Sequence, residues 1–334
     1  MKASFSIAKG LLASACVTLL VIVQAAAAQP PQHQKLVPKH LAVLRAGREN
    51  SNSRIVRPHA AFLLSAGTTK ATARINVKYT GFTPAAQKAF QAAVDVWGST
   101  LKSDVIINVN ANFKNLGDPR ILGSAGPTTL VKDFAHAPKP GTFYPIALAN
   151  KLAGTDLEPS DDDIDANFNS TFPNWYFGTD GLTPVGQYDF MSVVLHELGH
   201  GLGFIGSGST DTGGTGSLND PQFAYDLFVQ NGSGQKVLDS AQFPNPSAKL
   251  GQEFTGQNLF FSGPLTNSAH IPPGLPARLY APTVWEDGSS YSHLDEATFP
   301  AGDPNSLMTP QLGMNESIHT PGGIVMSIFR DMGW

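Results

Sequence analysis

The stretch VVLHELGHGLGFIG, residues 193–206, constrains this chain more than any other feature of its sequence. It places His196 and His200 four residues apart, with Glu197 directly after the first histidine. Residues four apart lie on one face of a helix, so both imidazoles can bind one zinc ion. Glu197 would project beside the metal and accept a proton from the water molecule that zinc activates. The pattern therefore indicates a hydrolytic zinc site.

The same stretch predicts where its helix begins and ends. Asp189 follows a turn-rich sequence and is a good N-cap, and valines and leucines form a buried stripe after it. Gly199, Gly201 and Gly203 then occupy alternate positions. Because each glycine weakens a helix interior by roughly 1 kcal/mol relative to alanine, they predict a closely packed helix that soon ends. Gly203 can adopt the left-handed conformation that ends a helix and lets the chain turn beneath the metal toward a third ligand.

Residues 1–28 are typical of an export signal. Lys2 and Lys9 give a positive start, an apolar run spans 11–23, and small residues up to Ala28 offer a cleavage site. The apolar run is short for a membrane span. The sequence thus predicts a secreted protein, extracellular or periplasmic, with no stable membrane span after the signal is removed.

Composition narrows the class of protein further. A hydrophobic fraction of 41% with 14% charged residues is typical of a globular chain with a core. Removing residues 1–28 takes two of the 22 basic residues and none of the 26 acidic ones, which leaves a net charge of −6. Such a surface has no basic patch for nucleic acid. Cys16 is the only cysteine, so the mature chain would have no disulfide and would depend on its core and any bound metal.

The sequence between the signal and the zinc helix divides into a linker or pro-segment and a periodic part. Residues 29–70 carry Pro, His and Arg with little periodicity. Thr83 and Pro84 then predict the start of a helix whose apolar residues share one face. Alternating or β-prone sequences predict strands at 74–82, 105–113 and 143–150.

The acidic stretch DDDIDANFNS, residues 161–170, has two interpretations. Carboxylate oxygens are ligands for calcium, so a calcium site is one of them. The spacing does not match an EF-hand loop, and a solvated acidic turn followed by a short strand is favoured. That strand, near 165–170, is predicted to be a sheet edge that pairs with an extended substrate.

The C-terminal part is expected to be largely irregular, because residues 204–290 are rich in Gly, Ser, Thr and Pro. A last helix is predicted with Thr320 as cap, Pro321 as first residue and Gly333 at its end. We therefore expect an N-terminal catalytic subdomain over 71–206 and a C-terminal subdomain over 207–334.

The sequence HELGHGLGF resembles the first part of the metzincin zinc motif, with Gly203 in the place of the motif's glycine. The short form of that motif has a histidine three residues later, where this chain has Gly206. The leishmanolysin-like metzincins insert a long segment there, and the sequences SYSHLDE, NSLMTP and SIFRDMGW resemble their C-terminal part. Leishmanolysins are rich in disulfides, so the resemblance is to the catalytic core in a cysteine-free, bacterial-type branch.

The resemblance implies that His293 is the third zinc ligand and that Met308 forms the tight turn beneath the metal. The two residues lie fifteen positions apart, in the order the family shows. Met308 could instead be an ordinary core methionine. Other residues remain alternatives for the third ligand: His270, Glu286, Asp295, Glu296 and His319.

Together these features predict an α+β fold of metzincin type, with a twisted mixed sheet, an active-site helix and an irregular C-terminal subdomain. The expected activity is zinc-dependent endopeptidase, with a protein or peptide substrate and Glu197 as general base. Two alternatives stay open: a hydrolase whose third ligand is Glu286 or Asp295, and a secreted binding module with structural zinc. The lack of cysteine excludes inhibition by a pro-segment thiol on the zinc.

Overall fold

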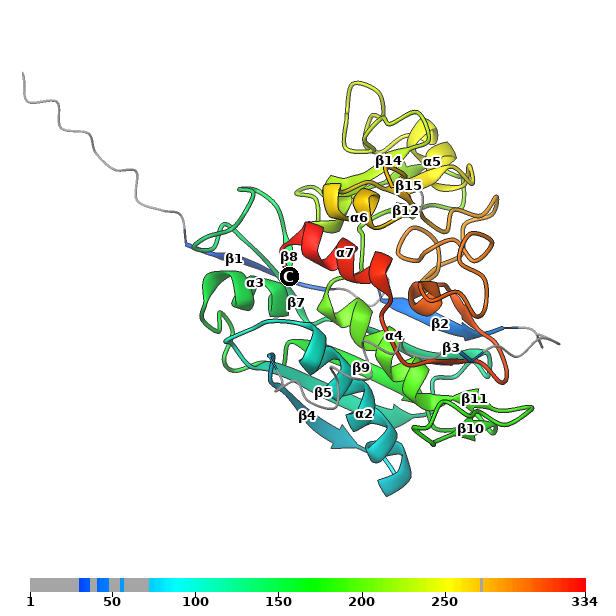
Figure 1. The fold of residues 1–334 in the computed structure, drawn as a ribbon. Coiled ribbons are helices and arrows are strands. Elements are labelled where there is room, and N and C mark those ends of the chain that lie inside the picture. The colour runs from blue at the N-terminus through cyan, green and yellow to red at the C-terminus, as the bar shows by residue number, and fades with distance from the viewer. Residues whose placement is uncertain (1–29, 37–40, 48–54, 57–71, 271–272) are drawn as a thin grey trace, which may run out of the picture.

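A computed structural model describes residues 30–36, 41–47, 55–56, 72–270 and 273–334 (Figure 1). The predicted signal at 1–28 lies outside the described residues, as does most of the predicted linker or pro-segment. The parts of that segment that are described form strands β1 (Gln32–Lys35), β2 (Ala42–Ala46) and β3 (Ile55–Val56).

The main sheet has six strands in the order β17-β2-β6-β9-β5-β4. The last three strands of this order are parallel, β6 is antiparallel to β9, and β2 is antiparallel to β6. The short β17 pairs parallel with β2. The newly named strands span Ile75–Thr80 (β4), Ile107–Lys114 (β5), Ile121–Pro127 (β6), Ile164–Asn169 (β9) and Gln311–Leu312 (β17). This confirms a mixed α+β fold and the predicted strands near 74–82 and 105–113.

The prediction that residues 165–170 form a sheet edge is wrong. Strand β9 lies inside the sheet, between β6 and β5. Its polar side chains bond to neighbouring polar groups of the sheet, since Asp165 accepts from Asn110 Nδ2 at 2.8 Å and from Asn167 Nδ2 at 2.9 Å. Polar side chains that are hydrogen-bonded inside a sheet cannot be distinguished, from sequence alone, from the solvent-exposed polar side chains of an edge strand.

Helices α2 (Pro84–Thr100) and α4 (Phe190–Leu202) pack against each other and the sheet, as Figure 1 shows. Thr83 caps α2 by accepting from the Ala86 backbone N–H at 3.2 Å, which confirms the predicted start. Trp97, on the buried face of α2, donates its indole N–H to the Leu195 carbonyl at 3.0 Å. This bond ties α2 to the middle of α4.

The prediction of a strand over 143–150 is wrong beyond its first residues. Strand β8 covers Tyr144–Pro145 and α3 follows at once over Ile146–Ala153. The segment IALANKLA consists largely of strong helix formers, and Gly154 ends it in the left-handed conformation. Strand β8 belongs to a small sheet of order β1-β7-β8, in which β7 is Thr129–Lys132.

The C-terminal half is more regular than predicted. Over residues 209–278 it contains a three-stranded antiparallel sheet of order β14-β15-β16, the paired short strands β12 and β13, two short helices and a 3-10 turn. These short elements escape a periodicity analysis because each is only a few residues long. They are β12 (Ser209–Thr210), β13 (Gly216–Ser217), η2 (Tyr225–Phe228), β14 (Val229–Asn231), α5 (Ala248–Phe254), β15 (Leu259–Phe261), α6 (Pro264–Ala269) and β16 (Ala277–Arg278).

The last helix, α7, covers Gly323–Met332 and ends at Gly333 as predicted. Its predicted start is wrong, because Gly322 rather than Thr320 is the N-cap. Gly322 has φ of 78°, a conformation that favours glycine, and the chain becomes helical only after it. The remaining elements are β10 (Trp175–Tyr176), β11 (Tyr188–Asp189), η3 (Ser306–Met308) and β18 (Ser317–Ile318).

Helix α4 lies at the centre of the molecule. All of its residues are buried, and Figure 1 shows it between the sheet with α2 on one side and α7 on the other. The elements from β12 to α6 gather beyond α7. No helix among the described residues has the length and apolar character needed to cross a membrane.

Candidate metal centre

Three imidazoles meet at the side of α4. His196 and His200 come from α4, and His293 comes from the loop after β16. Their Nε2 atoms lie 2.9 Å (196 to 200), 3.1 Å (200 to 293) and 3.2 Å (293 to 196) apart. Among the described residues, this histidine cluster is the group of side chains that could hold a metal ion.

The Nδ1 atom of each imidazole forms a hydrogen bond with a backbone carbonyl oxygen. The Nδ1 atom of His196 lies 2.5 Å from the Leu307 carbonyl oxygen. The corresponding distances are 2.7 Å from His200 to the Phe204 oxygen and 2.8 Å from His293 to the Ser289 oxygen. A carbonyl oxygen only accepts, so each Nδ1 carries the proton. The three Nε2 atoms therefore point unprotonated lone pairs at one another.

This arrangement fits a bound metal ion. Zinc–nitrogen bonds of 2.0–2.1 Å at tetrahedral angles place ligand nitrogens about 3.3 Å apart, close to the separations seen here. Burial lowers the pKa of His196 to about 4, and burial with the neighbouring imidazoles lowers the pKa of His200 and His293 well below the usual value. Neutral imidazoles are the form that binds a metal.

Glu197 lies next to the cluster on α4 but is not one of its members. Its Oε1 accepts from the Leu44 backbone N–H at 3.2 Å, and its Oε2 is buried without a hydrogen-bond partner. Burial raises the pKa of Glu197 well above its usual range, while the backbone N–H groups of Leu44 and Ala125 oppose that rise. A buried carboxylate oxygen without a donor is costly unless a ligand or water completes the site.

Each of the three glycines at the end of α4 is required for a different structural reason. A Cβ on Gly199 would meet the Met308 sulfur at 2.8 Å, and one on Gly201 would meet the Ile164 side chain at 2.3 Å. Gly203 caps the helix with φ of 123°. The glycines thus let η3, with Met308, and β9 approach the helix closely, and they let the chain leave it at Gly203.

Comparison with known proteins gives a family. A model described as SPBPB7E8-like matches residues 51–217, which is half of the chain. The chain belongs to the SPBPB7E8-like family. No curated protein and no solved structure matches it. The SPBPB7E8-like match contains His196, Glu197 and His200, and both β2 and His293 lie outside it.

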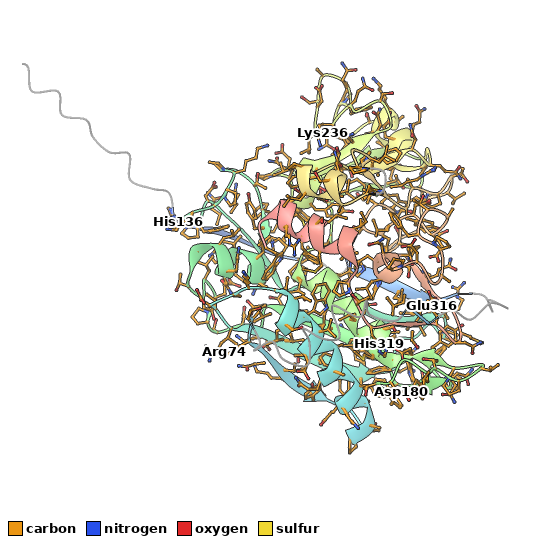
Figure 2. All side chains as sticks on the ribbon, in the orientation of Figure 1. Arg74, His136, Asp180, Lys236, Glu316 and His319 are labelled. Atoms are coloured by element: carbon orange, nitrogen blue, oxygen red, sulfur yellow. The ribbon has the colours of Figure 1, made fainter. Side chains whose placement is uncertain are left out.

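The alternative third ligands lie elsewhere in this SPBPB7E8-like chain. His319, labelled in Figure 2, binds Asp189 at the start of α4, with 2.9 Å between Nε2 and Oδ1. Glu286 accepts from the Tyr280 hydroxyl at 3.1 Å. His270 lies near the ring of Phe299. None of them, nor Asp295 or Glu296, belongs to the cluster.

The acidic stretch 161–170 does not gather around one point. Asp161 pairs with Lys35, and Asp162 pairs with Lys78 at 2.8 Å. Asp163 accepts from the Asn108 backbone N–H at 2.7 Å, and burial raises its pKa to about 7. Each of these three carboxylates has its own protein partner, and among the described residues this stretch provides no group of three carboxylate ligands.

Two contacts of the site are invisible in the sequence. Leu44 contributes a backbone N–H to Glu197, and Gly123 of β6 lies so close that a Cβ there would come within 2.9 Å of the Glu197 Cγ. Backbone groups carry no residue-type signal, so sequence patterns cannot identify them. The packing of β6 against α4 brings Gly123 to the site, and the pairing of β2 with β6 brings Leu44 there.

Proposed function

We propose that the protein is a secreted zinc-dependent endopeptidase of metzincin type. The observation that carries this proposal is the convergence of three unprotonated Nε2 atoms beside a buried glutamate with an unpartnered oxygen. Three histidines with one open position are the usual ligand set of a catalytic zinc, whereas structural zinc sites usually have four protein ligands.

His196, His200 and His293 would hold the metal. When bound in such a site, zinc acidifies a water molecule and polarises the carbonyl group of a substrate. The carbonyl partners of the three Nδ1 atoms fix the ring orientations and tautomers. The site therefore needs little rearrangement to take up the ion.

Glu197 would move the proton. It accepts a proton from the attacking water and passes it to the nitrogen of the leaving amine. The elevated pKa that burial gives Glu197 suits a group that must hold a proton between these steps, and a nearby dication would draw that pKa back down. Met308 lies against Gly199 of α4, and in this proposal it would support the cluster from the turn that the resemblance assigns to it.

Two further observations support the metzincin type and the location. The order of HELGHGLGF, His293 and Met308 resembles that of the leishmanolysin-like peptidases. The export signal predicted at 1–28 supports secretion. The substrate would be a protein or peptide.

A second candidate is a secreted binding module that keeps zinc as a structural ion. The observation in its favour is burial, because the cluster histidines and Glu197 are each 0–1% exposed. Peptidase activity that a chelator abolishes would exclude this candidate. Bound zinc without hydrolysis, in the intact and in the N-terminally processed chain, would support it instead.

The first test is metal content. We expect the purified protein to hold one zinc ion and the variant His293→Ala to lose it, because two imidazoles alone bind zinc weakly. His319→Ala is the matched control, since that histidine is also buried but binds Asp189, and it should retain the ion. The zinc content of the three purified proteins, measured by metal analysis, tests the ligand assignment. Equal zinc content in His293→Ala and wild type would contradict it.

The second test is Glu197→Gln. We expect this variant to keep zinc and to lose hydrolysis of an unfolded protein by about 10²–10⁴-fold, the usual contribution of a general base. Zinc loss equal to that of His196→Ala would show that Glu197 is a ligand. Near-normal turnover would rule out its role as base.

A further inference from the structure

His293 reaches the cluster from a loop, so its position depends on tertiary contacts. His196 and His200 share one helix, whose regular geometry fixes their spacing. The loop is bonded within the C-terminal half, where Tyr280 donates its backbone N–H to the His293 carbonyl at 2.8 Å. A separate set of contacts joins the loop to the chain that leaves α4.

The side chain of Tyr291, two residues before His293, makes most of these contacts. A Cβ on Gly206 would meet the ring Cε1 of Tyr291 at 2.2 Å, and a Cβ on Gly208 would meet the ring Cδ2 at 2.6 Å. Gly206 also donates its backbone N–H to the Ser292 hydroxyl at 3.0 Å. The two glycines that follow α4 therefore leave the space for a ring that the ligand loop carries.

The hydroxyl group of Tyr291 donates to Oδ1 of Asp226, a fully buried acid of η2, at 3.0 Å. Ser207, which lies between the two glycines, donates to the same carboxylate from its backbone N–H at 3.0 Å and from its hydroxyl at 2.5 Å. The backbone N–H of Phe223 adds a further bond at 2.9 Å. One buried carboxylate thus connects the ligand loop with the segment that leaves α4.

The charges of this pair suit a stable connection. Burial raises the pKa of Asp226, and the hydrogen bonds from Ser207, Phe223 and Tyr291 oppose that rise. Burial and the Asp226 carboxylate raise the pKa of Tyr291 well above its usual range, so the phenol keeps the proton that it donates. Removing one donor would leave a buried acid incompletely satisfied, so Asp226 and Tyr291 depend on each other.

The backbone of Tyr291 adopts an uncommon conformation. Its φ is 74°, in the left-handed region that a bulky aromatic residue rarely adopts. Such a conformation persists only where the surroundings impose it. Here the surroundings are Asp226 at the hydroxyl and Tyr225, whose own hydroxyl donates to the Tyr291 carbonyl at 3.3 Å. Contacts of Tyr291 thus determine the path of the chain just before His293.

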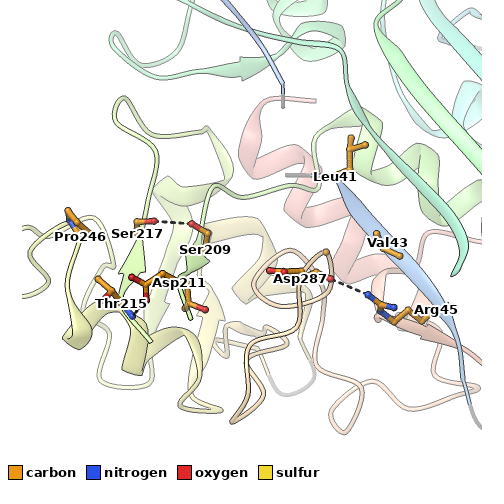
Figure 3. Close-up of a pocket in the computed structure, with 11 residues that line it drawn as sticks. Leu41, Val43, Arg45, Ser209, Asp211, Thr215, Ser217, Pro246 and Asp287 are labelled. Atoms are coloured by element: carbon orange, nitrogen blue, oxygen red, sulfur yellow. Dashed lines mark hydrogen bonds between the residues drawn. The ribbon is translucent and has the colours of Figure 1, made fainter. Parts of the chain in front are cut away.

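The two segments that this pair joins continue into the walls of an open cavity. The segment after Gly208 enters β12, where the hydroxyl of Ser209 lies 2.9 Å from that of Ser217, and both line the cavity (Figure 3). Asp287, a few residues before Tyr291, lines the same cavity. A shift of one segment against the other would therefore change both the cavity and the histidine cluster.

We propose that Asp226 and Tyr291 are positioning residues that lock the His293 loop against the chain leaving α4, and so hold the third imidazole at the cluster. This inference rests on the metal site of the proposed function. Neither residue belongs to the cluster, and each acts through His293. A loop that is already in place does not have to be ordered when the ion binds, so the pair strengthens metal binding.

Zinc affinity of the full chain tests the proposal. Tyr291→Phe keeps the ring and removes the hydroxyl, and we expect it to weaken zinc binding by about 10- to 100-fold, the usual effect of a residue that orients a metal ligand. Tyr144→Phe is the matched control. It also removes the hydroxyl of a buried tyrosine, which accepts from the Lys139 backbone N–H at 3.0 Å, and it should keep the wild-type affinity. Competition with a chromophoric chelator measures the dissociation constants.

Cobalt in place of zinc adds a readout that a purely structural role would not change. The visible absorption of bound Co²⁺ depends on the arrangement of its ligands, so Tyr291→Phe should alter this spectrum and Tyr144→Phe should not. Asp226→Asn is a second variant and should weaken zinc binding at least as much as Tyr291→Phe. Adding Tyr291→Phe to Asp226→Asn should cause little further loss, because the two residues act as one pair.

These measurements separate the inference from the proposed function. Unchanged zinc affinity and an unchanged cobalt spectrum in Tyr291→Phe would overturn the inference and leave the function standing. Equal weakening by Tyr291→Phe and Tyr144→Phe would reflect a general loss of stability and would also overturn it. Weaker zinc binding in Tyr291→Phe alone, in a protein whose wild type hydrolyses no peptide, would support the inference and refute the function. If Asp226→Asn does not fold, the Tyr291→Phe result decides.

Discussion

At the scale of single residues, burial decides the charge states around the site. The cluster histidines are kept neutral, and Glu197 lies with one oxygen on a backbone amide and the other without a partner. A second acid with a raised pKa, the half-buried Glu296, lies three residues after His293 in the chain. Burial, with the nearby Glu316 carboxylate as a smaller contribution, raises the pKa of Glu296 to about 7.

Glu296 gives a prediction about pH. In the unfolded chain its carboxyl loses the proton near pH 4.3, while in the folded protein it keeps the proton up to about pH 7. The folded state binds more protons in this window, so the free energy of unfolding falls as pH rises from about 4 to about 7. Glu296→Gln should remove this loss and be more stable than wild type at pH 8 by on the order of 1–2 kcal/mol, with little difference near pH 4.

Urea unfolding across the pH range measures this difference. Asp104→Asn, a change at an exposed acid, is the control and should leave the profile as in wild type. Parallel profiles of Glu296→Gln and wild type would contradict the assignment of the slope to Glu296.

At the scale of elements, the close approach of β9 and η3 to α4 sets the position of the histidine cluster. Gly201 faces Ile164 of β9, and Gly199 faces Met308 of η3, whose neighbour Leu307 holds His196. The glycines weaken α4 as an isolated helix, and the tertiary contacts that they permit hold it in place.

Gly201→Ala tests this balance. A Cβ would lie 2.3 Å from the Ile164 side chain, and Ile164 is buried and β-branched, so it cannot easily move away. Overpacking of this kind costs about 1–3 kcal/mol, which outweighs the roughly 1 kcal/mol gained in helix propensity. Gly323→Ala, at a helical position where a Cβ would meet no atom nearer than the Asn305 Oδ1 at 4.0 Å, is the control and should be neutral or stabilising. Thermal unfolding compares the two variants, and a stabilised Gly201→Ala would refute the packing argument.

At the scale of the whole molecule, the cluster joins distant parts of the chain. His196 and His200 come from α4, His293 comes from the C-terminal half, and Leu44 of β2 reaches the adjacent Glu197. An ion bound at the cluster would therefore link the two halves of the chain.

Removing the metal should therefore lower thermal stability. An ion that binds the folded state alone stabilises it by about 2.7 kcal/mol at one hundred times its dissociation constant. We expect a chelator to lower the Tm of the wild type by several degrees and to leave the Tm of His196→Ala unchanged. Scanning calorimetry with and without chelator measures this, and an equal response of both proteins would mean that the ion does not bind at the cluster.

The sequence by itself determined the features that depend on local spacing. The caps at Thr83 and Asp189, the end of α4 at Gly203 and the shared face of His196 and His200 all follow from residues within one or two helical turns. The resemblance to the leishmanolysin-like peptidases added His293 and Met308, which the structure places beside α4. Interactions between residues close in the chain depend on residue type and spacing, so these local features could be predicted from the sequence.

Only the tertiary structure decided which strands are neighbours and what covers the site. The place of β9 inside the sheet, the helix α3 after β8 and the amide of Leu44 on Glu197 depend on pairing between segments far apart in the chain. Such pairing is made by backbone groups that every residue carries, and it is selected by the packing of the whole core. No local sequence pattern indicates such pairing. For this reason the sequence predicts a linker or pro-segment over residues 29–70, whereas in the structure part of that segment, β2, lies in the main sheet against Glu197.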